Sequence, residues 1–552
     1  MVIASCSYTF RRAEMGLGKT IQTLGLILST LPSTQAFYHP GQAIATLIVC
    51  PKTVIPVWQE QINRFVNQGS IRMEVYSDER KRRSKIIPRV QNNEIDILIV
   101  SYETLACEFG DPWVDKRGNH IPDISDARFY RIVCDECQQI RNNKSKAFKA
   151  VMGVAAVSEH RLALTGSPFV NKPEDIHSLL CFVGLQPLDD PATFDQYITE
   201  PIKQRKRVGL TKLRAALAYT TLRRTKEGIR QSKDASDKFK IVEKTIHTMS
   251  IEFPEGPHKN IHNALYATTQ AIIMSSCAET EDGMDVNTGR GLFEMVLRIR
   301  QSCASPELVP PERIERALAA FAQIADDDGN VKQLTTQERL SLLEKLQVGS
   351  EEDSTAEDSN GCTEKASFDT SPKILALLQA AEKISKDEKG VIFSQWTSFL
   401  DLIGSALVHA GHKVCRIDGS MDLESRRLAM HTFATDDEVR FILCSLKAAG
   451  TGIDLARANH VFLMDPWWNE AVESQAIDRC HRITSTKPVF VHKLVMKGTI
   501  EERMIKIQKA KAMLGKASMQ KISKEEEKQA KMTAMKDLFQ IESNIVNEKW
   551  FY

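Results

Sequence analysis

Short apolar runs that end in polar residues recur in the first half of the chain, at residues 44–58, 96–105 and 129–136. Stretches with the spacing of amphipathic helices alternate with them, as in TIQTLGLILSTL at residues 20–31. Strands that alternate with helices pair side by side in a parallel sheet, whose functional loops lie at the carboxyl ends of the strands. The pattern therefore predicts an α/β lobe.

The same alternation restarts in the second half, with apolar runs at residues 390–396, 413–419, 439–445 and 460–466. A change in composition separates the halves: residues 349–369 contain seven acidic residues, one lysine and few apolar residues. Such a segment cannot form a core and is typical of a solvated linker. We therefore predict an α/β fold of two tandem lobes with parallel sheets.

Composition and charge narrow the class of protein. The 552 residues are too many for one hydrophobic core, and 26% charged with 42% hydrophobic residues is typical of a soluble globular protein. The formal net charge of +2 means that a nucleic-acid surface has to be a local patch. No apolar run is long enough to span a membrane, and twelve cysteines are too few for a disulfide framework, which favours a cytosolic or nuclear protein.

A glycine-rich stretch, AEMGLGKTIQTLG at residues 13–25, stands directly before a segment with helical spacing. Gly16 and Gly18 allow the backbone to turn its N–H groups toward a phosphate, and the helix N-terminus adds its dipole. Lys19 can reach the β- and γ-phosphates, and Thr20 can give its hydroxyl to Mg²⁺. The alternative is a glycine-rich turn with a chance lysine, and a second nucleotide motif decides against it.

The residues before this loop depart from the expected pattern. Ala13 stands at the first position of the G-x-x-x-x-G-K-[ST] motif. A phosphate loop should follow a buried strand, yet SCSYTFRR at residues 5–12 is a poor one. We therefore expect that the usual strand is missing and that the start is altered or truncated.

The second nucleotide motif is an acidic pair, Asp135 and Glu136, in RIVCDECQQIRNN at residues 131–143. The pair directly follows an apolar run, which predicts a place at the end of a buried strand. Asp135 can hold Mg²⁺ through water, and Glu136 can polarise the attacking water. The pair is therefore the expected partner of the phosphate loop.

Two cysteines around this pair indicate a different site. Cys134 and Cys137 have the spacing of half a zinc site or of a redox pair, but the chain contains no other C-x-x-C. His258 and His262 form an isolated helical i,i+4 pair of the kind usually found on a surface. Strand alternation points Cys134 into the core, so we interpret the stretch as a magnesium site with incidental thiols.

Five motifs in order along nearly the whole chain resemble one family. MGLGKT, DECQ, LALTGSPFVNKPEDIHSLL (162–180), FLMDPWWNEAVESQAIDRCHRI (462–483) and LVMKGTIEERM (494–504) are similar to those of the SWI/SNF-type helicase-like ATPases of superfamily two. TLRRTKE (221–227), VLRIRQSCASPELV (296–309) and SKEEEKQAKMTAMKDLF (523–539) resemble the branch of helicase-like transcription factor and the yeast post-replication repair translocases.

The resemblance implies that ATP and Mg²⁺ bind in a cleft between two RecA-like lobes. The first lobe would bind the phosphates through Gly16, Gly18, Lys19 and Thr20, and the metal through Thr20 and Asp135. A coupling segment, which links the nucleotide state to DNA contacts, would comprise Gln138, Thr165, Gly166 and Ser167.

The second lobe would supply Gln475, Arg479 and Arg482, which are three or four residues apart on one predicted helix face. The arginines resemble the family's fingers, which neutralise charge on the transferring phosphoryl group. Glu136, Asp135, Arg479 and Arg482 are therefore the predicted catalytic residues, and Gln475 is predicted to bind ATP. Without the phosphate loop, a surface ion-pair helix would be the simpler interpretation.

DNA contacts across both lobes are also implied, mostly to the DNA backbone. The segments that match the family's DNA-facing segments contain Lys52, Trp396, Lys447 and Thr451. For Trp396, packing in the core is an equal alternative. Residues 506–536, with nine lysines and three glutamates, predict a basic surface helix that is either a solvated face or a nucleic-acid contact.

We divide the chain into four parts: an ATP-binding lobe with a helical insertion (1–310), an acidic linker (311–371), a C-terminal helicase lobe (372–510) and a basic helical extension (511–552). The suspected branch often carries a zinc-binding RING domain between the lobes. Residues 310–371 contain only Cys362 and no histidine, so we expect no RING domain there.

The sequence thus predicts a nuclear, DNA-stimulated ATP hydrolase that translocates on double-stranded DNA in chromatin remodelling or DNA repair. Its expected partners are double-stranded DNA and chromatin, with no membrane. The alternative, from the class of binding proteins, is a catalytically weakened scaffold on DNA or nucleosomes, and the irregular start of the chain favours it.

Overall fold

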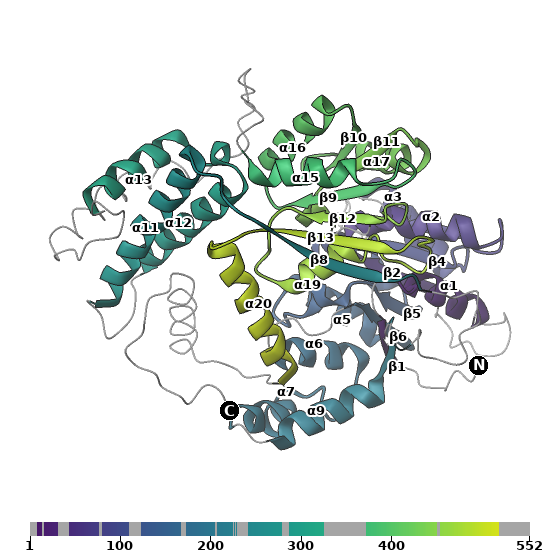
Figure 1. Cartoon of the computed structure of the whole chain (residues 1–552). Coiled ribbons are helices and arrows are strands. Elements are labelled where there is room, and N and C mark those ends of the chain that lie inside the picture. Colours follow the sequence, from purple (N-terminus) through teal and green to yellow (C-terminus); the bar gives the residue numbers. More distant parts are fainter. Residues whose placement is uncertain are drawn as a thin grey trace.

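Two parallel sheets organise the computed structural model (Figure 1). The structure describes residues 8–13, 16–30, 43–76, 80–109, 123–166, 173–204, 207–224, 226, 228, 241–278, 286–324, 371–449 and 453–517. Within these residues the fold is α/β, with two lobes that each contain one sheet, as the sequence predicts.

The first sheet has seven strands in the order β3-β4-β2-β5-β6-β1-β7, and each neighbouring pair is parallel. In chain order these strands are β1 (Tyr8–Ala13), β2 (Ala43–Cys50), β3 (Met73–Val75), β4 (Ile97–Ser101), β5 (Phe129–Cys134), β6 (His160–Thr165) and β7 (Thr221–Arg224). The main helices of this lobe are α1 (Lys19–Ser29), α2 (Ile55–Phe65), α3 (Arg80–Gln91), α4 (Tyr102–Glu108), α5 (Lys146–Ala156), α6 (Pro173–Val183) and α9 (Arg207–Thr220).

The central strands of this sheet are buried on both faces. In β2, Leu47 and Val49 lie in a core shared with α5 and α6, whereas Ile48 and Cys50 lie in a core shared with α1 and α2. Successive side chains of a strand point to opposite faces, so a strand covered on both sides has a continuous apolar run. This burial explains the apolar runs from which the strands were predicted.

β1 forms where the sequence predicts only a poor strand. Its backbone pairs with β6 from Tyr8 to Arg12 and with β7 from Phe10 to Ala13. The expectation that the usual strand before the phosphate loop is missing is therefore wrong. Backbone pairing with β6 on one side and β7 on the other holds this segment in the sheet. The local pattern of apolar residues cannot predict pairing with strands that are distant in the sequence.

The second sheet has six strands in the order β10-β11-β9-β12-β13-β8, again all parallel. These strands are β8 (Lys244–Ile251), β9 (Gly390–Ser394), β10 (Lys413–Ile417), β11 (Val439–Ser445), β12 (His460–Leu463) and β13 (Val489–Met496). The helices of this lobe are α15 (Pro372–Glu382), α16 (Thr397–His409), α17 (Leu423–Thr435), α18 (Leu446–Ala449), α19 (Glu470–Ile477) and α20 (Ile500–Ala517).

The position of β8 differs from the predicted division of the chain. Residues 244–251 fall within the range 1–310 assigned to the first lobe, yet β8 pairs with β13 along its whole length and extends the second sheet. In addition, α13 (Pro311–Ile324) occupies the start of the predicted acidic linker. Local composition cannot show which sheet a strand joins, and the four-part division itself stays a prediction.

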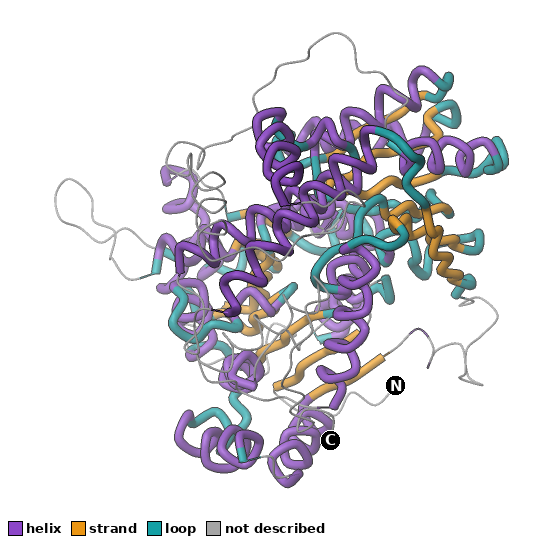
Figure 2. The backbone as a smooth tube through the Cα atoms, turned by 60° about the vertical axis from the view of Figure 1, so that its left-hand side comes forward, coloured by secondary structure: helices purple, strands orange, loops and turns teal. Residues whose placement is uncertain are grey.

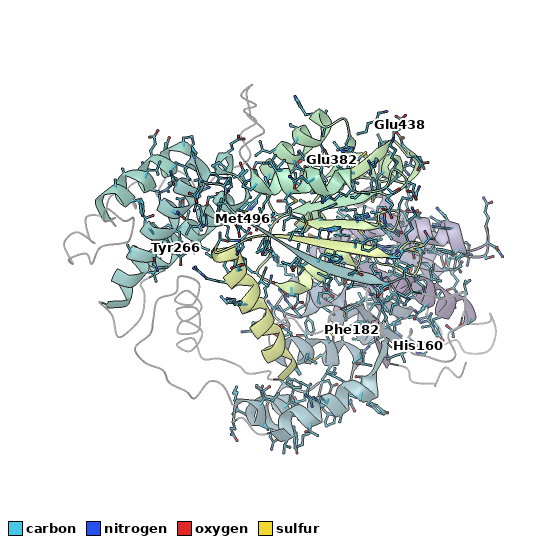
Figure 3. All side chains as sticks on the ribbon, in the orientation of Figure 1. His160, Phe182, Tyr266, Glu382, Glu438 and Met496 are labelled. Carbon is cyan, nitrogen blue, oxygen red and sulfur yellow. The ribbon has the colours of Figure 1, made fainter. Side chains whose placement is uncertain are left out.

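Helices α11 (Pro257–Ala278), α12 (Val286–Ala304) and α13 form a block beside the second sheet (Figure 1, Figure 2). An apolar cluster joins the block to α20 and includes Met496 at the end of β13. Tyr266 of α11 faces α20 and accepts a hydrogen bond from Arg503 (Figure 3). None of the helices in the described residues combines the length and apolarity of a membrane span.

His258 and His262 are buried between α11 and α12, so their interpretation as a surface pair is wrong. The Nε2 atom of His258 lies 2.6 Å from the carbonyl oxygen of Ser302, and Nδ1 of His262 lies 2.9 Å from its hydroxyl. Burial lowers the pKa of His262 to about 3, which keeps its imidazole neutral. The pair therefore fastens two helices together.

A buried ion pair gives a first prediction. Lys373 and Glu501 are at most 1% exposed, and Nζ of Lys373 lies 2.7 Å from Oε1 of Glu501. We expect Lys373→Met to lower the free energy of unfolding by about 3–5 kcal/mol, because the carboxylate is left buried without its partner. Arg427→Met, in a pair whose side chains are both 74% exposed, should cost less than about 1 kcal/mol. Equal costs in chemical denaturation would contradict this difference.

Candidate active site between the lobes

The predicted phosphate loop lies directly before α1 and against the second lobe. Gly16 and Gly18 have φ angles of +82° and +69°, which favour glycine. The carbonyl oxygen of Gly16 accepts a hydrogen bond from the Ile483 backbone N–H at 3.1 Å. A Cβ atom on Gly16 would lie 3.0 Å from the Cα atom of Arg482. A glycine is therefore required at residue 16 both by backbone conformation and by the approach of the second lobe.

The acidic pair follows β5, as predicted, and hydrogen bonds fix Asp135 from three sides. Its Oδ2 atom accepts from the Trp58 indole N–H at 3.0 Å, and Oδ1 accepts from the Glu136 backbone N–H at 2.9 Å. Its carbonyl oxygen accepts from the Tyr102 hydroxyl at 2.8 Å. Both aromatic side chains are buried, so the carboxylate is held in one orientation.

Charges from both lobes converge on this pair. Burial, together with the nearby Glu136 carboxylate, raises the pKa of Asp135 to about 6, and Lys19 opposes this rise. Burial also lowers the pKa of Lys19, while the Glu136 and Asp135 carboxylates act to raise it. Arg479 of the second lobe belongs to the same group: burial lowers its pKa to about 10, and Glu136 counteracts the effect.

A chain of hydrogen bonds leads from Glu136 to the end of β6. The Gln138 side-chain amide donates to Oε2 of Glu136 at 2.8 Å, and its carbonyl oxygen accepts from the Thr165 hydroxyl at 2.8 Å. The structure thus brings together two of the predicted coupling residues with the predicted catalytic glutamate. Gly166 is half-buried after Thr165, and Ser167 lies outside the described residues.

The three predicted residues of the second lobe do not share a helix face. α19 ends at Ile477, so only Gln475 is helical, and it is half-buried. Arg479 and Arg482 lie in the following turn. Arg482 donates to the Ile453 carbonyl oxygen at 2.6 Å and pairs with Asp454 at 3.2 Å, so its guanidinium contacts its own lobe. The predicted ATP contact of Gln475 and finger role of Arg482 stay predictions.

The two cysteines of the acidic motif are core residues. Cys134 and Cys137 are fully buried in the apolar core of the first lobe, and burial raises the pKa of both thiols. Among the residues that the structure describes, no three His, Cys, Asp or Glu side chains are grouped to hold a metal. A zinc site at these thiols therefore has no support in the described part of the chain.

The oxygen donors at the loop and the acidic pair fit Mg²⁺. Magnesium takes oxygen ligands and commonly combines one or two carboxylates with phosphate oxygens and water. Each oxygen of the Asp135 carboxylate accepts one hydrogen bond within the protein, which leaves lone pairs for a metal or its bound water. The Thr20 hydroxyl, in the first turn of α1, would be the second protein donor.

The predicted DNA contacts are dispersed over both lobes. Lys52 is exposed in the short 3₁₀ helix Lys52–Val54 before α2. Trp396 is half-buried against the core of the second lobe, and the Arg300 guanidinium lies 5.8 Å from its ring, in agreement with the packing alternative. Lys447 belongs to α18, but its side chain is not described. Thr451 lies outside the described residues.

Several residues that shape the site belong to no motif that marks them in the sequence. Trp58 and Tyr102 are outside the predicted site, and the residues that they contact at Asp135 are 77 and 33 positions away in the sequence. Lys226, in TLRRTKE, donates hydrogen bonds to Asp478, directly before Arg479, and to the carbonyl oxygen of His481, two residues after it. The residue types alone only weakly indicate a role in the site, because a tryptophan, tyrosine or lysine that bonds a buried carboxylate has no fixed sequence separation from it.

Comparison with known proteins adds to this geometry. Residues 12–308, more than half of the chain, match the family model of the SNF2-related domain. The chain belongs to the SNF2-related family. Residues 372–484 match the helicase conserved C-terminal domain. These matches confirm the resemblance to SWI/SNF-type helicase-like ATPases that the motifs predict.

Relatives of this SNF2-related chain include two fungal DNA repair proteins. The chain is 28% identical to RAD5 of Gibberella zeae, over 95% of its own length and 55% of that protein. It is 28% identical to rad8 of Schizosaccharomyces pombe, over 90% of its own length and 51% of that protein. The chain thus spans about half the length of these relatives.

A solved structure of a Sulfolobus solfataricus SWI2/SNF2 ATPase core in complex with dsDNA is also similar. It aligns with 97% of this chain and 91% of its own, at 22% identity and a TM-score of 0.37.

The loop geometry gives a second prediction. We expect Gly16→Ala to weaken the binding of a fluorescent ATP analogue about tenfold, because the Cβ atom strains the backbone and meets Arg482. Gly25→Ala is the matched control, since a Cβ atom at this helical glycine would enter open space. Unchanged affinity in Gly16→Ala would contradict the close packing of the loop on the second lobe.

The hydrogen-bond chain gives a third prediction. Thr165→Val preserves shape but removes the hydroxyl that fixes Gln138, so we expect kcat for ATP to fall about tenfold with little change in KM. Thr199→Val is the control, because Thr199 is equally buried and its hydroxyl has no hydrogen-bond partner among the described residues. Similar steady-state kinetics for the two variants would exclude a role of this hydroxyl.

Proposed function

We propose that the chain hydrolyses ATP between its two lobes and uses hydrolysis to translocate on double-stranded DNA. The observation that carries this proposal is the contact of the phosphate loop with the turn that contains Arg479, made by the Gly16–Ile483 hydrogen bond, which brings Lys19, the acidic pair and Arg479 within electrostatic reach of one another. Positive charge from separate lobes around a pair of carboxylates suits phosphoryl transfer, in which catalysis depends on positioning and on stabilising charge.

Each group has a distinct role in this proposal. Lys19 and the backbone N–H groups of the loop bind the phosphates, and Arg479 stabilises the charge that develops on the transferred group. Glu136 orients the attacking water and accepts its proton, while Gln138 fixes the Glu136 carboxylate. Thr20 and Asp135 would hold Mg²⁺, which neutralises phosphate charge when it is bound.

Contact between the lobes supports the coupling of hydrolysis to movement. The hydrogen bond between Gly16 and Ile483 joins the phosphate loop to the turn that carries Arg479. Separation of the lobes would remove Arg479 from the acidic pair, so each turnover requires a closed state. Cycles of closure and opening are a physical means to step along a DNA backbone.

DNA repair is the favoured setting because the fungal relatives carry the name DNA repair protein. We propose double-stranded DNA, and chromatin that contains it, as partners and the nucleus as the location. The alternative, a catalytically weakened scaffold on DNA or nucleosomes, rests on the irregular start of the chain. The pairing of β1 with β6 and β7 places a strand before the phosphate loop, which weighs against one part of that irregularity.

The proposal gives a fourth prediction, for ATP hydrolysis measured with and without double-stranded DNA. DNA should stimulate the wild-type rate, and Lys19→Ala should abolish measurable hydrolysis. Glu136→Gln should lower kcat about 10²- to 10⁴-fold, and Arg479→Ala about 10³-fold, while both retain ATP binding. Exposed Arg427→Ala is the control and should keep the wild-type rate.

Absence of hydrolysis in the wild-type chain, together with normal DNA binding, would favour the scaffold instead. Stimulation by RNA but not by DNA would contradict the proposed partner. Movement itself is measured by displacement of a triplex-forming strand from duplex DNA, which should require ATP and Glu136.

A further inference from the structure

The chain crosses from the first sheet to the second through residues 225–243, of which 226, 228 and 241–243 are described. We call this segment the connection, and residues 478–483 the finger turn. Lys226, at the start of the connection, is 7% exposed. Its Nζ atom donates to Oδ1 of Asp478 at 2.8 Å and to the carbonyl oxygen of His481 at 2.6 Å.

The His481 side chain binds both ends of the connection. Its Nε2 atom lies 2.8 Å from the carbonyl oxygen of Val242, which can only accept, so Nε2 carries the proton. Its Nδ1 atom, 3.2 Å from Nζ of Lys226, is then the acceptor. Burial and the ammonium group of Lys226 lower the pKa of His481, in agreement with this neutral tautomer.

The connection also touches the phosphate loop. Ile241 and Leu17 form a small buried apolar cluster. At the end of the finger turn, the Ile483 backbone N–H donates a hydrogen bond to the carbonyl oxygen of Gly16 in the phosphate loop. The finger turn is thus in contact with Gly16 of the phosphate loop and with Lys226 and Val242, which are described residues of the connection.

The ion pair between Lys226 and Asp478 has an electrostatic consequence for the next residue, Arg479. The Asp478 carboxylate raises the pKa of Arg479, as do Glu136 and Asp135, so it competes with them for the guanidinium charge. Because the Lys226 ammonium group neutralises Asp478, the Arg479 guanidinium interacts mainly with the carboxylates of the acidic pair. Its bond to the His481 carbonyl oxygen fixes the backbone two residues after Arg479.

We propose that Lys226 is a positioning residue, which holds the finger turn so that Arg479 faces the acidic pair of the other lobe. His481 completes the clamp by joining Lys226 to Val242. This inference rests on the proposed ATP hydrolysis, and it assigns to the connection a part in assembling the site.

The test begins with Lys226→Met, which keeps the length of the side chain and removes its charge and N–H donors. We expect kcat to fall about 10²-fold, because a shift of about 1 Å in a catalytic group costs that much, while KM for ATP changes less than about threefold. Lys226→Arg retains charge and donors, so it should restore most of the activity. An unchanged kcat in Lys226→Met would overturn the inference.

A double-mutant cycle separates positioning from a general loss of structure. If Lys226 acts through Arg479, then Lys226→Met should cost less than about twofold in kcat once Arg479→Ala is present. The same 10²-fold loss in both backgrounds would overturn the inference. Inactivity of the wild-type chain would instead overturn the proposed function, so the two failures are distinguishable.

Lys389→Met is the matched control. Lys389 is also buried, and its Nζ atom donates to the carbonyl oxygens of Phe433 and Asp436 within the second lobe. We expect this variant to lower the thermal unfolding temperature but to keep kcat within about twofold of wild type. Equal losses of kcat in Lys389→Met and Lys226→Met would show a general effect of destabilisation and overturn the inference.

Discussion

The repulsion between two adjacent carboxylates in a buried site is the constraint on which the rest of the structure depends. Asp135 is buried and Glu136 is half-buried beside it, and burial raises the pKa of Asp135 to about 6. Such a pair is stable in its ionised form only when positive charge is close. Lys19 supplies positive charge from the same lobe and Arg479 supplies it from the other lobe. The stability of the ionised pair therefore depends on both lobes.

The two halves of the site differ in how firmly they are held. Asp135 follows a central strand, and Trp58 and Tyr102 fix it through buried hydrogen bonds within its own lobe. Arg479 lies in a turn after the end of α19, and much of what holds that turn comes from the connection and from the phosphate loop. The carboxylates are therefore preformed, whereas the orientation of the arginine depends on contact between lobes.

The sequence was informative where chemistry constrains residue type and spacing. A phosphate loop requires glycines, a lysine and a following helix, and these features predicted the position of α1 and of the residues before it. The relay from Glu136 to Gln138 and Thr165 lay within motifs that the resemblance had already singled out.

The remainder depends on pairing between distant segments, which has no local pattern. Residues 5–12 have the pattern of a poor strand, yet β1 pairs with strands on both sides, and nothing in residues 244–251 indicates that β8 extends the second sheet. The spacing of His258 and His262 predicts a surface pair because their hydrogen-bond partner, Ser302, is 40 or more residues away and cannot be identified from the sequence. The end of α19 at Ile477 was missed, since periodicity continues through a turn as readily as through a helix.

The edge position of β8 also bears on how the protein could be divided. Because β8 precedes the helical block α11–α13 and the other strands of its sheet follow it, that sheet is assembled from two separate stretches of chain. A fragment that starts at α15 would lack β8 and would expose the backbone of β13, normally paired from Val489 to Met496. Exposed strand edges promote aggregation. Separate expression of the lobes therefore calls for a cut between Arg224 and Lys244, with the helical block kept on the second lobe.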